Sequence, residues 1–342
     1  MDFFETIQSL TQCPGPSGRE DSAAAAALEL LRPLVDEAWQ DRLGNVLGVK
    51  RCGRPDARKV LLDAHLDEVG LVVTGYDGPF LRVASIGGID PRVLVDREVE
   101  LLTQPPVRGI LAAKLPEEPD RAPEKGDLRI DLGLPERTVR ERVPIGTPAV
   151  YVQPLFQLGE GGLAGKSLDD RCCFALLLRT LELIDPQKLD VDLYVLGSMG
   201  EETDSRGAIT AARRIAPDCA VAVDVTFAKS PDCTESGCFP LGEGPALGVG
   251  PNVSRWMLRR LRDKAAELEQ KVQLEVMAGS TGTNGWDMQI QAGGIAVALV
   301  SVPLRYMHTP IEVISGADLE HSARLLSAFV EGIGEEALSC WS

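Results

Sequence analysis

The sequence is poor in several residue types, and each shortage argues against a class of protein. Its 342 residues include only 3 His, and aromatic residues make up 5% of the chain. No apolar run approaches the roughly 18 residues that a membrane-spanning helix needs. Acidic residues outnumber basic ones by 51 to 35, which gives a net charge of -16. Nucleic acids and anionic membranes attract basic surfaces, so we expect neither as a partner.

The 8 cysteines do not have the spacing of a metal cluster. They include no Cys-x-x-Cys pair, and Cys172 and Cys173 are adjacent within an apolar stretch. We therefore predict reduced, mostly structural thiols and a cytoplasmic protein. The stretch MDFFETIQSLTQ has acidic residues and no basic flank, which indicates an amphipathic helix rather than a signal peptide.

Two sequence patterns divide the chain. Apolar runs typical of buried parallel strands alternate with helical patterns in residues 1–67 and 165–342. Between 68 and 164, short β-rich runs separated by Gly, Asp and Pro predict a small barrel or sandwich, with a charged, Pro-rich loop at 114–127. The predicted fold is therefore an α/β domain interrupted by a β-rich insertion.

Histidine and acidic residues occur where the apolar runs end. His65 and His308 follow two of these runs, Glu201 and Glu202 follow a third, and Asp224 interrupts a fourth. Open α/β sheets bind ligands at the carboxyl ends of their strands. Imidazoles and carboxylates that converge there suit zinc, cobalt or manganese. The set is too large for one open zinc site and fits two metal ions that share a carboxylate.

Most of these residues also have a simpler interpretation. Asp169 and Asp170 precede a helical pattern, where an aspartate is usually a cap, and an acidic residue after a strand is usually solvated. His321 has no partner at ligand spacing, so we interpret it as a surface or satisfied histidine. Asp224 is harder to explain this way, because a carboxylate in an apolar strand must be paired or metal-bound.

Six stretches, in this order, resemble the M42 family of metallo-aminopeptidases: HLDEVG, IGGIDPRVLV, KSLDDRC, EETDSRGA, VDVT and LRYMHTPIE. Relatives are called glutamyl or tetrahedral aminopeptidases, and some carry an endoglucanase label. The resemblance covers nearly the whole chain. It implies a zinc-exopeptidase-like catalytic domain, with a mixed sheet flanked by helices, at 1–67 and 165–342. It also implies a barrel-like dimerisation and assembly domain at 68–164, and a homo-oligomer that builds from dimers to a larger, tetrahedral shell.

The resemblance also implies a set of metal ligands. His65 and Asp224 would bind one ion, Glu202 and His308 would bind the other, and Asp169 would bridge both. Zinc is the first expectation for the two ions, with cobalt or manganese as alternatives. All five positions carry a suitable side chain, which argues against an inactive relative.

The remaining roles follow from the same resemblance. Glu201 would be the general base, and Asp67 would hydrogen-bond the imidazole of His65 and fix its tautomer. The peptide bond between Asp169 and Asp170 is expected to be cis. The chain departs from the family at STGTNGWDMQ, where Asn284 stands in place of a Thr-Asp-Ala sequence, so the contribution of Asn284 to the substrate pocket is open.

These features favour a di-metal aminopeptidase that acts on short peptides. A related di-metal deacylase or carboxypeptidase remains open, because the ligand set alone does not exclude it. A glycoside hydrolase is less favoured, since such enzymes mostly use two carboxylates without metal, and sugar platforms need aromatic residues that are scarce here. A non-enzymatic binding role is least favoured, because burying an acidic cluster is costly.

Overall fold

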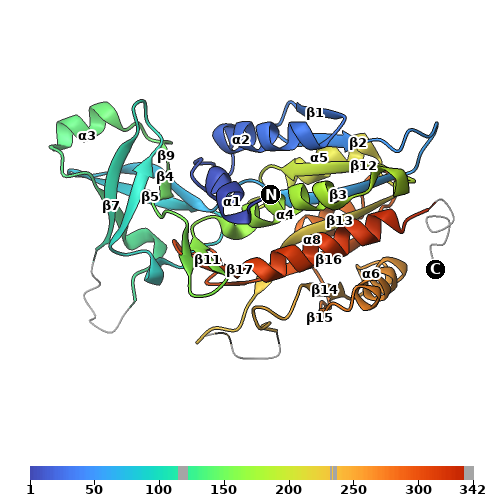
Figure 1. The fold of residues 1–342 in the computed structure, drawn as a ribbon. Helices are drawn as coiled ribbons and strands as arrows, with labels where there is room; N and C mark the ends of the chain where they lie inside the picture. Colours follow the sequence, from blue (N-terminus) through green and yellow to red (C-terminus); the bar gives the residue numbers. More distant parts are fainter. Residues whose placement is uncertain (115–121, 232, 234–236, 335–342) are drawn as a thin grey trace.

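The computed structural model describes residues 1–114, 122–231, 233 and 237–334. It contains a large mixed sheet covered by helices and a closed six-stranded barrel. Figure 1 shows the barrel, with α3, at the left and the large sheet with its helices at the right. This architecture confirms the predicted α/β class with a barrel-like insertion. Part of the predicted loop at 114–127 lies outside the described residues.

The helices differ in length and in how much of their surface is buried. Those described are α1 (Phe3–Thr11), α2 (Asp21–Leu31), α3 (Glu136–Arg142), α4 (Leu168–Leu183), α5 (Arg206–Ile215), α6 (Arg255–Glu267), α7 (Asn284–Met288) and α8 (Gly316–Glu331). Helix α4 is apolar nearly all round because it lies between the sheet and the helices α1 and α8. None of the described helices is both long and apolar enough to cross a bilayer.

The large sheet has parallel strands at its centre and antiparallel strands toward its edges. Its spatial order is β1 (Glu37–Gln40), β2 (Val46–Lys50), β12 (Asp192–Ser198), β3 (Lys59–His65), β13 (Cys219–Phe227), β16 (Ala296–Arg305), β17 (Glu312–Ser315), β11 (Gly162–Gly165) and β10 (Phe156–Leu158). Off this path, β14 (Ala246–Val249) pairs with β15 (Gln273–Val276) and with β16. The central strands β12, β3, β13 and β16 run parallel, so their carboxyl ends share one edge.

Helices cover both faces of this sheet, which explains the nearly continuous apolar runs of its central strands. In β3, Val60 and Leu62 join the core beneath α1, α2, α4, α6 and α8. Leu61 between them points to the opposite core, against residues of α5 and α7. Successive side chains on a strand point to opposite faces, so each apolar residue of such a strand has a core to enter.

The barrel is antiparallel and encloses its own core. Its strands follow the order β4 (Gly70–Asp77), β5 (Phe80–Ile86), β8 (Leu128–Asp131), β7 (Val107–Ala113), β6 (Arg97–Leu101) and β9 (Pro148–Tyr151). Inward residues such as Leu71, Leu81, Val99 and Leu111 are buried together. The barrel strands end at Tyr151, and β10 and β11 pair with the large sheet.

Strand β8 and helix α3 were not predicted from the sequence. Both lie in a charged region, and the apolar–polar alternation of β8 extends over only four residues. Strand β8 forms because β5 and β7 offer it hydrogen-bonding edges, and α3 carries two ion pairs at helical spacing, Arg137–Glu141 and Arg140–Glu136. Neither contribution can be recognised from hydrophobic periodicity alone.

The prediction that the cysteines are reduced is wrong for one pair. Cys233 and Cys238 form a disulfide, and their Cα atoms lie 6.0 Å apart, an ordinary distance for such a bridge. Five other described cysteines are free, among them Cys172 and Cys173. The pairing depends on how the loop after β13 folds back, which the spacing of the two cysteines does not determine.

Candidate active site

The carboxyl edge of the large sheet brings together the residues predicted from the strand ends. His65 ends β3 and lies opposite Ser198, the last residue of β12. Gly200 then takes a φ of +70°, which favours glycine, and the chain turns into Glu201 and Glu202. Asp224 lies near the end of β13. The parallel arrangement therefore gathers side chains that are far apart in the sequence.

Two groups of potential ligands share one aspartate. His65, Asp169 and Asp224 form the first group, and Asp169, Glu202 and His308 form the second; the ligand atoms of each lie within 4.8 Å of one another. Asp169 Oδ1 lies 3.1 Å from His65 Nε2, and its Oδ2 lies 3.3 Å from His308 Nε2. The two oxygens of one carboxylate thus face the two histidines.

The carboxylates attract positive charge to both imidazoles. Burial lowers the pKa of His308, but hydrogen bonds to Asp169 and Glu202 outweigh burial and raise this pKa to about 11. Burial likewise lowers the pKa of His65, and contacts with Asp169 and Asp67 raise it well above its usual value. The pKa of Asp169 falls below its usual range, because both histidines outweigh the effect of burial.

The other carboxyl groups are destabilised as anions by burial. Burial raises the pKa of Asp224 well above its usual value and also raises the pKa of Glu202. Burial raises the pKa of Glu201 to about 8, with Glu202 adding repulsion and His65 opposing it. A second source of positive charge at this site would relieve these costs.

The donor set fits divalent metal ions. Each group offers one imidazole nitrogen and carboxylate oxygens, the mixture that zinc, cobalt and manganese accept. Asp169 can contribute one oxygen to each group, as a bridging ligand must. Metal binding requires neutral histidine and ionised carboxylate, so an ion would compete with protons for both kinds of ligand.

Asp67 orients more of the site than the sequence indicated. Its carbonyl oxygen lies 3.1 Å from His65 Nδ1, and its carboxylate Oδ1 lies 3.4 Å from the same nitrogen. The carboxylate also accepts the backbone N–H groups of Glu201 (3.0 Å) and Glu202 (3.2 Å) and the hydroxyl of Ser17 (2.5 Å). Asp67 therefore connects the end of β3 to the turn that carries both glutamates.

Glu312, to which the sequence analysis gave no role, supports the opposite side of the site. Its Oε2 accepts the backbone N–H of Asp169 at 3.1 Å, and its Oε1 accepts that of His308 at 3.0 Å. Burial raises its pKa well above the usual value. Its position within the quoted LRYMHTPIE stretch, at the start of an apolar strand, is the same kind of signal that singled out Asp224.

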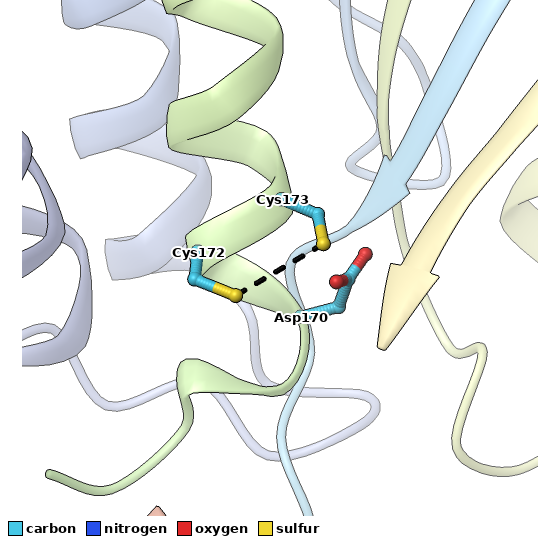
Figure 2. Close-up of side chains that lie close together, drawn as sticks. All are labelled: Asp170, Cys172 and Cys173. Atoms are coloured by element: carbon cyan, nitrogen blue, oxygen red, sulfur yellow. Dashed lines mark hydrogen bonds between the residues drawn. The ribbon is translucent and has the colours of Figure 1, made fainter. Parts of the chain in front are cut away.

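A third group, Asp170, Cys172 and Cys173, lies at the start of α4 (Figure 2). All three are fully buried, and the two sulfur atoms lie 3.9 Å apart. Asp170 Oδ2 accepts the backbone N–H of His65 at 3.1 Å, so it helps to fix the end of β3. Burial raises the pKa of the Cys173 thiol well above its usual value, which keeps the thiol protonated and disfavours metal binding. The peptide bond between Asp169 and Asp170 is cis, as the resemblance implied.

A pocket of about 630 Å³ opens onto the two ligand groups. The barrel contributes Gly88 to its wall, where a Cβ would come within 3.3 Å of His308 Nδ1, so only glycine fits without displacement. Trp286, Met277 and Met307 supply apolar surface. The insertion therefore takes part in shaping the site, although it supplies none of the residues of the two ligand groups.

Asn284 does not line this pocket. It is 2% exposed, and its Nδ2 donates to Asp63 Oδ2 and Ser198 Oγ, both at 2.8 Å. Asn284 thus supports the ends of β3 and β12 from behind, while its neighbour Thr283 faces the pocket. His321 lies on α8 and belongs to none of the ligand groups found among the described residues.

Comparison with known proteins identifies the family. A family model described as M42 glutamyl aminopeptidase matches residues 44–325. The lysyl aminopeptidase of Pyrococcus furiosus is 32% identical over 343 residues, which cover 97% of each chain. Aminopeptidase APDkam598 from the archaeon Desulfurococcus kamchatkensis has a TM-score of 0.91 and 33% identity, covering 98% of this chain and 96% of that one. The TET1 peptidase of Pyrococcus horikoshii has a TM-score of 0.83 and 26% identity, covering 97% of this chain and all (100%) of that one.

These matches confirm the resemblance drawn from the six sequence stretches. They extend over both the sheet domain and the barrel, so they concern the whole architecture rather than a shared motif. Together with the ligand groups at the sheet edge, they show that this chain belongs to the M42 family of aminopeptidases, enzymes that hydrolyse peptide bonds.

Proposed function

We propose that this chain is a di-metal aminopeptidase that removes N-terminal residues from short peptides. The observation that carries the proposal is the shared aspartate. His65 and Asp224 would hold one divalent ion, His308 and Glu202 the other, and Asp169 would bridge them. Two such ions, zinc by first expectation and cobalt or manganese as alternatives, would supply Lewis acids that activate water and polarise the scissile carbonyl.

Glu201 is the proposed general base. Its Oε2 lies 3.9 Å from His65 Nε2, beside the ligands but beyond hydrogen-bond distance, and the residue lines the pocket. It takes a proton from the attacking water and returns it to the leaving amine. The Asp67 carboxylate accepts the backbone N–H groups of Glu201 and Glu202 and so fixes the turn that carries them. The side chain of the proposed base and that of the adjacent proposed ligand can therefore point in different directions.

The proposal is tested with chelated enzyme that is reloaded with zinc, cobalt or manganese. Fluorophore release from a panel of aminoacyl substrates measures aminopeptidase activity, and metal content by mass spectrometry gives the number of ions. The matched controls are the same substrates with an acetylated α-amine. Activity that survives chelation contradicts the metal centre. Release of acetate from the acetylated substrates supports the deacylase alternative, and release of C-terminal residues from peptides supports a carboxypeptidase.

We further propose that the barrel, within the insertion predicted at 68–164, contributes a contact between copies of this chain. The barrel region exposes large apolar side chains, among them Phe80, Val93, Ile110 and Ile145. The similar TET1 peptidase of Pyrococcus horikoshii can assemble into a tetrahedron or a large octahedral shell. A shell with enclosed active sites would admit short or unfolded peptides. A monomer by light scattering at micromolar concentration contradicts the assembly, and rapid cleavage of folded proteins contradicts the enclosure. A cytoplasmic location stays a prediction.

A further inference from the structure

The pocket contains a carboxylate that neither the proposed metal centre nor the proposed base uses. Glu275, on β15, lines the pocket and is partly buried. Its Oε1 accepts a hydrogen bond from Thr226 Oγ1 at 2.5 Å, and its Oε2 accepts one from Ser301 Oγ at 2.9 Å. Both donors are neutral. Within the described part of the chain, no lysine or arginine forms an ion pair with Glu275.

The pocket as a whole is acidic. Of the described residues, none that lines it is lysine or arginine. Beyond the proposed ligands and base, its carboxylates are Asp204, Glu275 and Asp287. Asp204 already accepts from Arg206 Nη1 at 3.0 Å, so its charge is partly balanced. A substrate side chain that enters this pocket therefore meets negative charge, which repels an acidic residue and attracts a basic one.

Strand geometry places Glu275 at a suitable distance from the reacting centre. Ser301 on β16 lies opposite Asp224 on β13, and Thr226 lies two residues beyond Asp224 on the same face. Neighbouring strands are about 5 Å apart, and residues two apart on a strand are about 7 Å apart. The hydroxyls that hold Glu275 thus lie within one long side chain of a proposed metal ligand.

The surroundings of Glu275 suit a long cationic side chain. Met277, Trp286 and Met307 line the same pocket and offer apolar surface to a methylene stem. Burial raises the pKa of Glu275, while the hydrogen bonds from Thr226 and Ser301 oppose this shift. An incoming ammonium or guanidinium group would favour the charged carboxylate further.

We propose that Glu275 determines specificity in this pocket and selects peptides whose N-terminal residue is lysine or arginine. The inference rests on the proposed aminopeptidase function and names its substrate class. A purely structural role is the competing explanation, because the two hydroxyl contacts also connect β15 to β13 and β16. The two explanations differ in whether the effect of Glu275 depends on the charge of the substrate.

The test pairs each basic substrate with a neutral one of similar shape. The metal-loaded wild type is assayed with lysyl and norleucyl p-nitroanilides, and with arginyl and citrullyl p-nitroanilides. We expect kcat/KM to be about 10-fold or more higher for the basic member of each pair, because one charged hydrogen bond separates them. Glu275→Gln retains the shape and accepts from one hydroxyl. It should lower kcat/KM for the basic substrates by about 10–100-fold and change kcat/KM for the neutral substrates by about 2-fold or less.

A matched control and a binding measurement complete the design. Asp263→Asn removes one carboxylate from the exposed surface of α6, outside the pocket lining, and should leave every ratio unchanged. Calorimetric titration with free L-lysine and L-norleucine reports affinity without turnover. Wild type should bind lysine more tightly, and Glu275→Gln should bind the two alike.

The outcomes separate this inference from the proposed function. If loaded wild type cleaves no aminoacyl substrate, the proposed function fails, and this inference fails with it. If it cleaves norleucyl substrates as well as lysyl ones, or prefers glutamyl substrates, the function stands and the specificity is wrong. If Glu275→Gln lowers kcat/KM by the same factor for all substrates, the role of Glu275 is structural and the inference is overturned.

Discussion

Replacing Glu201 with glutamine separates proton transfer from metal binding. Glutamine has nearly the same shape, but its neutral amide does not accept the proton from water. The backbone N–H of residue 201 still donates to Asp67 Oδ1, so the turn keeps its anchor. Because Glu201 Oε2 lies 3.9 Å from His65 Nε2, losing its charge breaks no hydrogen bond to a proposed ligand.

The magnitude follows from the proposed role. Positioned acid–base groups contribute about 10²–10⁴-fold to a reaction, so we expect Glu201→Gln to lower kcat by that factor. At about 1.36 kcal/mol per tenfold, the barrier rises by about 3–5 kcal/mol. Burial raises the pKa of Glu201 to about 8, and two divalent cations beside it would lower this pKa, so that the carboxylate could accept a proton near neutral pH.

The matched variant is Glu202→Gln, one residue along the chain. Glu202 Oε1 lies 3.2 Å from His308 Nε2 within the second ligand group. This change should weaken the occupancy of one ion, and added metal should partly restore activity. The assay is kcat on an aminoacyl substrate beside metal content by mass spectrometry. Near-normal turnover in Glu201→Gln, or metal loss in Glu201→Gln without loss in Glu202→Gln, would refute the assignment.

Three further predictions concern stability and metal. Arg171→Met removes a buried guanidinium that donates to the carbonyls of Leu10, Cys13 and Leu66 and to Glu68, so urea unfolding should show a loss of about 3–5 kcal/mol; a loss below about 1 kcal/mol contradicts this. Burial raises the pKa of Glu68, but Lys166 and Arg171 outweigh burial and lower it below 4.5. Its contribution to stability is therefore present above pH 4.5 and lost as the pH falls through the folded-state pKa, and Glu68→Gln should make acid unfolding curves shallower there. Chelation should abolish peptide cleavage and zinc, cobalt or manganese should restore it, with metal content and activity rising together; activity in metal-free enzyme refutes the centre.

The central strands and the general place of the site follow from the sequence alone. Apolar runs covered on both faces form parallel strands, and a parallel sheet gathers the ends of its strands at one edge. The sequence therefore groups His65, Glu202 and Asp224 at one edge of the predicted sheet. Asp224 was the clearest signal, because an anion inside an apolar strand needs a partner.

Tertiary structure decided the features that depend on packing between distant segments. Strand β8 exists because β5 and β7 provide edges for a charged stretch, and the Cys233–Cys238 disulfide depends on the path of a loop. Glu312 supports the site through its hydrogen bond with Asp169, and Asn284 is held behind the pocket by its hydrogen bond with Ser198. Each of these pairs is separated by more than 80 residues of sequence. Local patterns specify which segments become strands and where charge accumulates. Which donor meets which acceptor is set only when the sheet and its helices close around them, because unpaired buried polar groups are too costly to leave.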